Sequence, residues 1–178
     1  MKDPYDKCPV LETEHFILRL IKKYDAEDLF ECYSDVNSQR YFNSDNCTTE
    51  FTFKTLDEMN RCIDSWLSEY ENKKYIRFSI VYKITGKVIG TIEIFGGKYG
   101  VLRVDIKSEY EKQEHLKEII EVAVNNFFTL FKINRIITKA IPEAIERRKA
   151  LMDYGFIENT KKMKPFKENY FCKDIEIF

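Results

Sequence analysis

The chain has 178 residues, a formal net charge of −1, and 44% hydrophobic and 33% charged residues. This composition is typical of a globular protein, and the length suits one substantial core better than two. The near-zero charge argues against a nucleic-acid-binding surface, which normally needs a clear basic excess. We therefore expect a single domain over residues 1–178 whose partners are small molecules or proteins.

The five cysteines are scattered, without a CxxC motif or a Cys/His spacing. Reduced thiols in a cytoplasmic protein fit this pattern better than disulfides do, and no metal site is indicated. The N-terminal residues, MKDPYDKCPV, lack the apolar core of a signal peptide. No apolar run approaches the ~18 residues of a membrane span, so no membrane segment is expected.

The first part of the chain predicts one strand and then two helices. Residues 15–21, HFILRLI, are typical of a short strand. A helix should follow, with Asp25 as its N-cap and Asp28 three residues later. After a polar stretch, a second helix should open with a capping box formed by Thr55 and Glu58.

The middle of the chain predicts an antiparallel meander of three strands. The runs 75–83, 87–97 and 100–106 are rich in β-branched residues and are separated by glycine turns, one of them at Thr85-Gly86. The first two runs alternate apolar and polar residues only imperfectly. Strands that are covered on both faces show this pattern.

Helices and strands alternate in the last part of the chain. Residues 116–131 place apolar side chains at i, i+3, i+4 and i+7, which predicts a core helix. A strand at 134–141 should precede a helix that Pro142 begins and Gly155 ends, and a strand in 170–178 closes the chain. The full order is β-α-α-β-β-β-α-β-α-β-β. It predicts an α/β (α+β) fold with a mixed, mostly antiparallel sheet flanked by helices.

Two segments at opposite ends of the chain carry a family resemblance. They are LETEHFILRLIKKYDAEDLFECYSD near the start and RRKALMDYGFIE near the end. With the element order, they make the chain resemble the GNAT superfamily of acyl-CoA-dependent N-acetyltransferases, and most closely its ribosomal-protein N-terminal acetyltransferase branch. The resemblance covers nearly the whole chain. It implies acetyl-CoA as the cofactor and a primary amine, of a small molecule or a peptide N-terminus, as the acceptor.

In that family a turn of pattern Q/R-x-x-G-x-G/A opens the third helix, and its backbone N–H groups hold the acetyl-CoA pyrophosphate. The pattern falls on residues 111–116 here, and all of its signature positions have changed, to Glu111, Glu114 and Leu116. A carboxylate at a helix start opposes an anion by roughly 0.3–1 kcal/mol, and a lost glycine geometry costs roughly 1–2 kcal/mol more. Together they approach about 3 kcal/mol, or about a hundredfold in affinity.

The resemblance therefore implies a weakened acetyl-CoA site at this turn. The helix start still offers backbone donors whatever its side chains are, and Lys112, His115 and Lys117 add cationic contacts. The expected cofactor-binding residues are Ile106, Lys112, Gln113, Glu114, His115, Leu116 and Lys117.

Direct attack by an amine needs a group that removes a proton from it, and a carboxylate often serves. Glu93 and Asp105 are candidates, because each interrupts an apolar strand expected in mid-sheet. The ordinary alternative is that either residue faces a solvated edge or pairs with Arg77 or Arg103.

Some family members carry a tyrosine four residues before the glycine of the GF pair, where it protonates the leaving thiolate. Leu151 stands at that position here, and an asparagine frequent in the family is replaced by Ala144. Tyr154, next to Gly155, is the candidate substitute if it turns inward. The alternative is a tyrosine packed at the end of a helix.

The run Arg147, Arg148 and Lys149 lies on the last expected helix. Such a run is usually a solvated helix face, although in the family this helix passes near the adenosine end of CoA and could reach its 3′-phosphate.

Two functions stay open at this point. The first is an acetyl-CoA-dependent N-acetyltransferase, and the second is a non-catalytic binding or regulatory protein with the same fold. A different anionic or acyl ligand in the same cleft is a weaker third. The sequence names no acceptor, and a homodimer is one option for the assembly.

Overall fold

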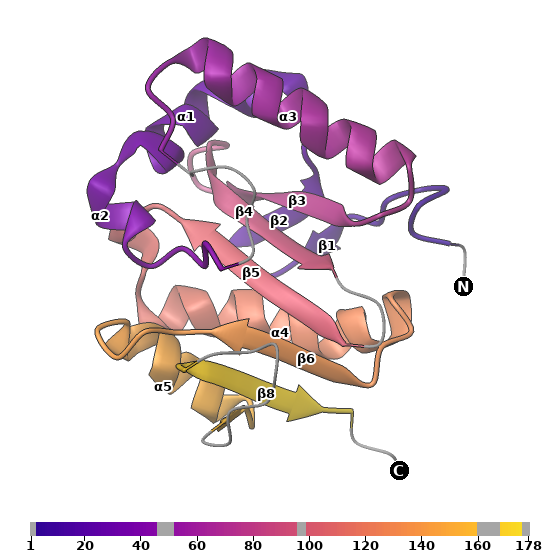
Figure 1. Cartoon of the computed structure of the whole chain (residues 1–178), viewed down its shortest axis with the longest axis vertical. Helices are drawn as coiled ribbons and strands as arrows, with labels where there is room; N and C mark the ends of the chain where they lie inside the picture. Colours follow the sequence, from indigo (N-terminus) through magenta and orange to yellow (C-terminus); the bar gives the residue numbers. More distant parts are fainter. Residues whose placement is uncertain (1–2, 46–51, 96–98, 160–167, 176–178) are drawn as a thin grey trace.

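The computed structural model describes residues 3–45, 52–95, 99–159 and 168–175. Their strands form one open sheet in the order β1-β2-β3-β4-β5-β6-β8-β7 (Figure 1). The strands are β1 (Leu11–Glu12), β2 (Phe16–Leu20), β3 (Ile76–Tyr82), β4 (Val88–Phe95), β5 (Gly100–Ile106), β6 (Arg135–Lys139), β7 (Ile157–Glu158) and β8 (Tyr170–Asp174). Among the strands of the described residues, only β5 and β6 pair in parallel, which confirms the predicted mixed, mostly antiparallel sheet.

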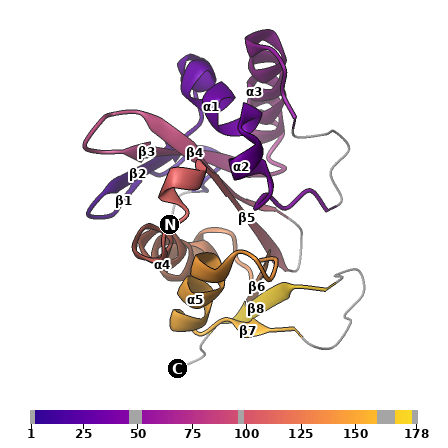
Figure 2. The same ribbon diagram turned by 90° about the vertical axis from the view of Figure 1, so that its left-hand side faces the viewer.

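Helices lie on both sides of the sheet, as predicted (Figure 2). The helices are α1 (Ala26–Ser34), α2 (Val36–Gln39), α3 (Leu56–Glu71), α4 (Gln113–Leu130) and α5 (Ile145–Asp153). The first three lie on one side, and α4 and α5 lie on the other. Each side has its own apolar core, represented by Leu29 of α1 and Ile63 of α3 on one side and by Ile120 and Phe127 of α4 on the other.

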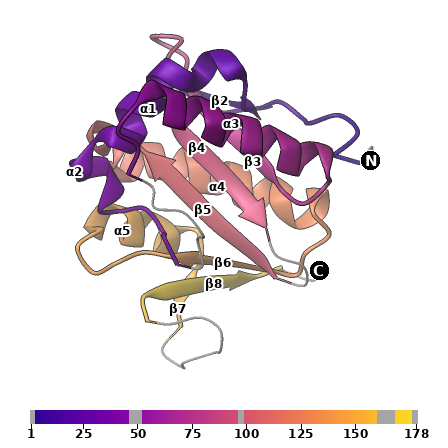
Figure 3. The same cartoon turned by 45° about the horizontal axis from the view of Figure 1, so that its top comes forward.

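The strands β3, β4 and β5 form the predicted antiparallel meander in the middle of the sheet. Figure 3 shows α1 and α3 lying over this part. Every residue of β3 and of β4 is buried except the last in each, Tyr82 and Phe95, so both faces of these strands are covered. The turn at Thr85-Gly86 is also confirmed, with Gly86 at a φ of 70°.

The parallel pair β5 and β6 is short. Gly100, Val101 and Leu102 of β5 face Ile136, Ile137 and Thr138 of β6, and the register continues no further. The later residues of β5 stay paired with β4, so β5 and β6 part after Leu102. The helix α4 connects the two strands, and η2 (Ser108–Tyr110), a 3₁₀ turn, precedes it.

Two helix-end predictions are confirmed. The Oγ1 atom of Thr55 accepts a hydrogen bond from the Glu58 amide at 3.3 Å, and the Glu58 carboxylate accepts one from the Thr55 amide at 3.2 Å. At the end of α5, Gly155 has a φ of 76°, and the Phe156 amide donates to the Leu151 carbonyl at 3.0 Å. Glycine tolerates this left-handed conformation without strain, which explains why the helix stops there.

Asp25 is the N-cap residue of α1, as predicted, but its side chain does not cap the helix. The helix α1 begins at Ala26 as expected. The carboxylate is buried and accepts two hydrogen bonds from Arg19, at 2.7 and 2.8 Å, and one from Ser79 at 2.7 Å. It ties β2, β3 and the start of α1 together instead.

Pro142 does not begin the last helix, which is a second correction. It lies in a turn in which the Ala144 amide donates to the Ile141 carbonyl at 3.0 Å, and α5 starts at Ile145. The short strand β1 and the short helix α2 were not predicted. With two and four residues they are too short for a hydrophobic period to reveal.

Candidate active site

A buried polar cluster lies on the face of β3, β4 and β5 that α1 and α3 cover. Arg77 of β3 lies at its centre, with 3% of its surface exposed, and its NH2 atom is 2.5 Å from Oε2 of Glu93 on β4. Its NH1 atom donates to the Tyr33 hydroxyl at 2.9 Å and to the Thr91 hydroxyl at 3.0 Å. The guanidinium also stacks over the Trp66 ring, 4.0 Å from its centroid. The cluster therefore holds charge in an otherwise apolar interior.

Glu93 is paired with two arginines. Its Oε2 atom contacts Arg77, and its Oε1 atom accepts a hydrogen bond from Arg103 of β5 at 3.1 Å. Arg103 also donates to the Asp45 carbonyl at 2.7 Å. Both oxygens of this candidate base are thus occupied, as the pairing alternative described. Its catalytic role stays a prediction.

Asp105 is different, because only one of its oxygens is held. Oδ2 accepts a hydrogen bond from Tyr33 at 2.8 Å and lies 3.5 Å from NH1 of Arg77. Oδ1 is buried and has no hydrogen-bond partner among the described residues. Burial raises the pKa of the Asp105 carboxyl above its usual value, against the opposing effect of Arg77. A buried carboxylate with one open oxygen and a raised pKa can accept a proton from a group that reaches it.

The parting of β5 and β6 lies three residues before Asp105 along β5. Beyond it, the Val104 carbonyl accepts a hydrogen bond from NH1 of Arg147, a residue of α5, at 2.8 Å. The adjacent Arg148 donates from its NH1 atom to the carbonyl of Ala140, just after β6, at 3.1 Å. Two neighbouring arginines of α5 therefore each bind a backbone carbonyl, one on β5 and one just after β6.

Arg147 also forms a bidentate ion pair with Glu111, in the turn before α4. Its Nε and NH2 atoms each lie 2.7 Å from a Glu111 oxygen, and both side chains are 5% exposed. The solvated-face interpretation of the run 147–149 is therefore wrong for Arg147, although Lys149 is exposed and pairs with Glu146. No periodicity links Arg147 to Glu111, which lies 36 residues earlier, so the sequence did not reveal this pair.

The first turn of α4 keeps open backbone donors. The amides of Gln113, Glu114 and His115 have no hydrogen-bond acceptor among the described residues, and the first amide with one is that of Leu116. Lys112 stands at the N-cap position and makes no side-chain cap. Such a helix start attracts an anion through its N–H groups and dipole.

The side chains predicted to bind the cofactor have varied surroundings. Ile106 and Leu116 are buried in the core. Gln113 and Lys117 both contact Asp153 at the end of α5, at 2.8 and 2.7 Å. Lys112 and Glu114 are exposed around the helix start, where they can face a ligand.

His115 lies in an aromatic group next to β2. Its ring is within 6.3 Å, between centroids, of the rings of His15, Phe16, Tyr82 and Tyr110, and burial lowers its pKa. Its Nδ1 atom is buried without a hydrogen-bond partner among the described residues. The side chain therefore points toward the sheet instead of toward the helix start.

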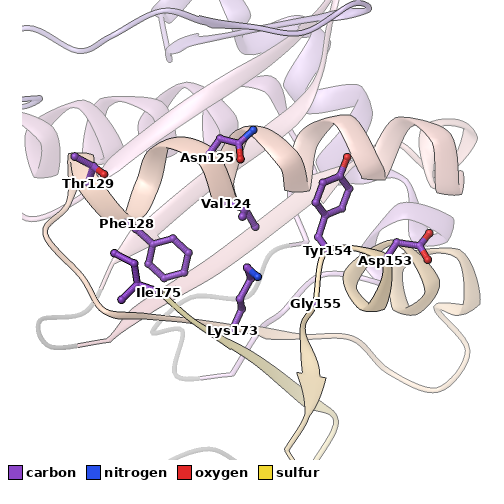
Figure 4. A pocket seen from close by; sticks show the side chains of 9 residues that line it. All are labelled: Val124, Asn125, Phe128, Thr129, Asp153, Tyr154, Gly155, Lys173 and Ile175. Carbon is purple, nitrogen blue, oxygen red and sulfur yellow. The ribbon is translucent and has the colours of Figure 1, made fainter. Parts of the chain in front are cut away.

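Tyr154 lies away from the polar cluster, in a pocket of about 650 Å³ (Figure 4). The pocket is lined by residues of α4, of the end of α5 and of β8: Val124, Asn125, Phe128, Thr129, Asp153, Tyr154, Gly155, Lys173 and Ile175. Burial raises the pKa of the Tyr154 hydroxyl, and Glu121 of α4 adds to the rise. Its role as an acid stays a prediction, and its surroundings match the alternative of a tyrosine packed at a helix end.

Sequence reasoning missed Tyr33 as a member of the cluster. Its helical spacing marked it only as a residue of the buried face of α1. A tyrosine on that face offers a hydroxyl that needs a partner in the interior, and this was the available signal.

Within the described ranges, no group of three or more His, Cys, Asp or Glu side chains could hold a metal ion. In the same ranges, no helix is long and apolar enough to span a membrane.

A family model described as "Acetyltransferase (GNAT) domain" matches residues 15–157. The chain belongs to this family. The GNAT chain is 26% identical over 152 residues to YoaA of Bacillus subtilis, an uncharacterized N-acetyltransferase, covering 83% of this chain and 82% of the relative.

Solved structures of ribosomal-protein acetyltransferases share the fold. One is the ribosomal-protein-S5-alanine acetyltransferase from Vibrio fischeri, with a TM-score of 0.73, 20% identity, and coverage of 93% of this chain and 96% of that one. Another is Mycobacterium smegmatis RimJ in complex with CoA-disulfide, with a TM-score of 0.72, 15% identity, and coverage of 89% and 81%. The predicted GNAT fold and the likeness to the ribosomal-protein branch are confirmed.

Proposed function

We propose that the protein transfers an acetyl group from acetyl-CoA to a primary amine, of a small molecule or a peptide N-terminus, by direct attack. One observation carries this proposal: Asp105 is a buried carboxylate with an open Oδ1, close to where β5 and β6 part. GNAT family membership supplies the reaction class, and the open oxygen supplies a group that can deprotonate the amine.

Asp105 would act as the proton acceptor. An amine is protonated at neutral pH and cannot attack until it loses a proton, and Oδ1 offers the place for that proton. Tyr33 and Arg77 hold the other oxygen, which keeps the carboxylate oriented while it works. Acetyl-CoA would supply the activated acetyl group and a thiolate leaving group.

The start of α4 has some features that suit the phosphates of acetyl-CoA and one that opposes them. The open amides of Gln113, Glu114 and His115 suit a phosphate oxygen, and Lys112 lies beside them. The Glu114 carboxylate opposes the same charge, which is why we expect weak cofactor binding.

The test is an acetylation assay with acetyl-CoA and a panel of diamines and peptides with free N-termini, read by mass spectrometry and by release of CoA thiol. We expect acetylated product from at least one class of amine, and a rate at least tenfold lower for Asp105→Asn. The exposed Asp64→Asn serves as the matched control and should behave as wild type. Absence of product with every amine would refute the proposal.

A second candidate, a non-catalytic binding or regulatory protein, is favoured by a specific observation. Arg147 and Glu111 occupy the region where the strands part, and Glu114 lies at the helix start. A titration with CoA followed by thermal unfolding separates the two functions, because a ligand at a hundred times its Kd stabilises the fold by ~2.7 kcal/mol. No stabilisation at millimolar CoA, together with no product, would favour the non-catalytic function.

A further inference from the structure

The starting point is a pair of neighbouring arginines on α5. Arg147 donates to the carbonyl of Val104 on β5, and Arg148 donates to the carbonyl of Ala140, just after β6. In a continuous sheet, main-chain donors of the neighbouring strand would satisfy such carbonyls. Here a helix side chain, Arg147, satisfies the Val104 carbonyl and takes the position of a main-chain donor of an added extended chain. Arg148 lies toward β7 and β8 instead, next to Glu158 and Phe171.

Arg147 is held firmly in this place. Its guanidinium makes two bonds of 2.7 Å to Glu111 and one of 2.8 Å to the Val104 carbonyl, and a longer one of 3.4 Å to the Tyr41 carbonyl. Removing one partner from a buried ion pair leaves an uncompensated charge, so the pair resists separation. Arg148 is less buried and reaches outward to Glu158.

We propose that Arg147, held by Glu111, controls access of the acyl donor to the part of β5 that β6 leaves unpaired after Leu102, and that it must release Val104 before the donor binds. This rests on the proposed function, since the donor is an acyl thioester whose amide-containing arm can pair with an exposed strand. An extended ligand gains affinity by bonding main-chain groups that a sheet leaves open, and Val104 offers such a group only after Arg147 has left.

The same pair also affects the anion site at the start of α4. Glu111 lies two residues before Gln113, the first residue of the helix, and Arg147 neutralises it. When Arg147 moves, Glu111 loses its counter-ion close to a phosphate of the donor. Donor binding is therefore expected to work against the ion pair, and replacing both partners removes this opposition.

The experiment compares CoA binding by calorimetry in wild type and in the double variant Glu111→Gln/Arg147→Ser. Both charges are removed together because a single change would leave the other buried without a partner. The matched control is Arg135→Ser/Asp174→Asn, which removes a bidentate Arg–carboxylate pair on the exposed ends of β6 and β8. We expect at least tenfold tighter CoA binding in the first variant and unchanged binding in the control. Equal or weaker binding in the first variant would overturn the proposal.

A second measurement uses the wild-type protein and does not depend on the variant's stability. The Nε–H group of Arg147, protected by Glu111, should give a slowly exchanging ¹⁵N–¹H signal, assigned by its loss in Arg147→Lys. CoA should shift or remove this signal, and a signal that persists unchanged while CoA binds would overturn the proposal. Both measurements report binding only. A protein that passes them without acetylating any amine would refute the proposed function and leave this inference standing.

Discussion

The hydroxyl of Tyr33 on α1 donates a hydrogen bond to Oδ2 of Asp105 on β5 at 2.8 Å, across 72 positions of the chain. The same hydroxyl accepts a hydrogen bond from Arg77. This contact fixes which oxygen of Asp105 is held and which is left open. It therefore couples the helix that covers the sheet to the carboxylate proposed to receive the proton.

Replacing Tyr33 by Phe should move the pH dependence of acetyl transfer. The hydrogen bond from Tyr33 favours the ionised carboxylate, so its loss raises the pKa of Asp105 further. Because Asp105 must be ionised to accept a proton, the acid limb of kcat/KM should shift to higher pH. Burial, Arg77, Glu93 and Arg147 also act on Asp105, and they remain in the variant. The exposed Tyr24→Phe is the control, and an unmoved acid limb would contradict the assignment.

Replacing Gly90 by Ala should be strongly destabilising. A Cβ atom at Gly90 would lie 2.0 Å from the Asp105 carbonyl oxygen and 2.6 Å from the Ile106 Cα atom, so β4 and β5 would have to separate. We expect a loss of about 3 kcal/mol in the free energy of unfolding, the upper end for overpacking. Urea unfolding at pH 7 measures it.

Gly86→Ala provides the comparison. It meets no atom within 4 Å, and its φ of 70° alone should cost about 1–2 kcal/mol. A loss at Gly90 no larger than the loss at Gly86 would show that the close approach of β4 and β5 does not limit the side chain.

Replacing Arg77 by Met should destabilise the fold by about 3–5 kcal/mol, because Glu93 loses one buried partner and Asp105 loses its nearest cation. Adding Glu93→Gln should recover part of this loss, since it removes the stranded charge. A double-mutant cycle by chemical unfolding gives the coupling energy. The exposed ion pair of Lys149 and Glu146 is the reference, and Lys149→Met is expected to cost less than about 1 kcal/mol in the free energy of unfolding. Similar losses for the two changes would argue against a buried ion pair.

His15 should make stability depend on pH. Its Nδ1 atom lies 2.6 Å from Oε1 of Glu118, and this hydrogen bond raises the pKa of His15. Its contribution is complete below the unfolded pKa of about 6.5 and is lost as the pH rises through the higher folded pKa. His15→Gln should therefore lower the Tm more at pH 5.5 than at pH 8.5. Equal effects at both values would mean that the protonated pair does not form.

His115 should act in the opposite direction. Burial lowers its pKa, so the unfolded chain binds a proton more readily below pH ~6.5, and stability falls as the pH decreases. His115→Gln should lessen the acid sensitivity of wild type, whereas His15→Gln should increase it. Thermal unfolding over the same pH range measures both.

Much of the fold followed from local patterns in the sequence. The meander, α4 and the capping box at Thr55 each depend on residues close together in the chain, where period and turn chemistry act directly. The site depended on contacts that no period encodes. Asp25 is held by Ser79, 54 positions away, and Arg147 by Glu111, 36 positions away. Local rules assigned both side chains to ordinary roles, because a cap or a solvated face is what such residues usually provide.

The two outer strands of the sheet, β1 and β7, have two residues each. An edge strand attracts another chain through its row of unpaired amides and carbonyls, and short edges give such a chain little to join. The described part of this sheet is thus poorly suited to growth by strand addition, which protects against aggregation. A homodimer of this chain is accordingly expected to form through its helices instead of through a sheet continued from one copy into the next.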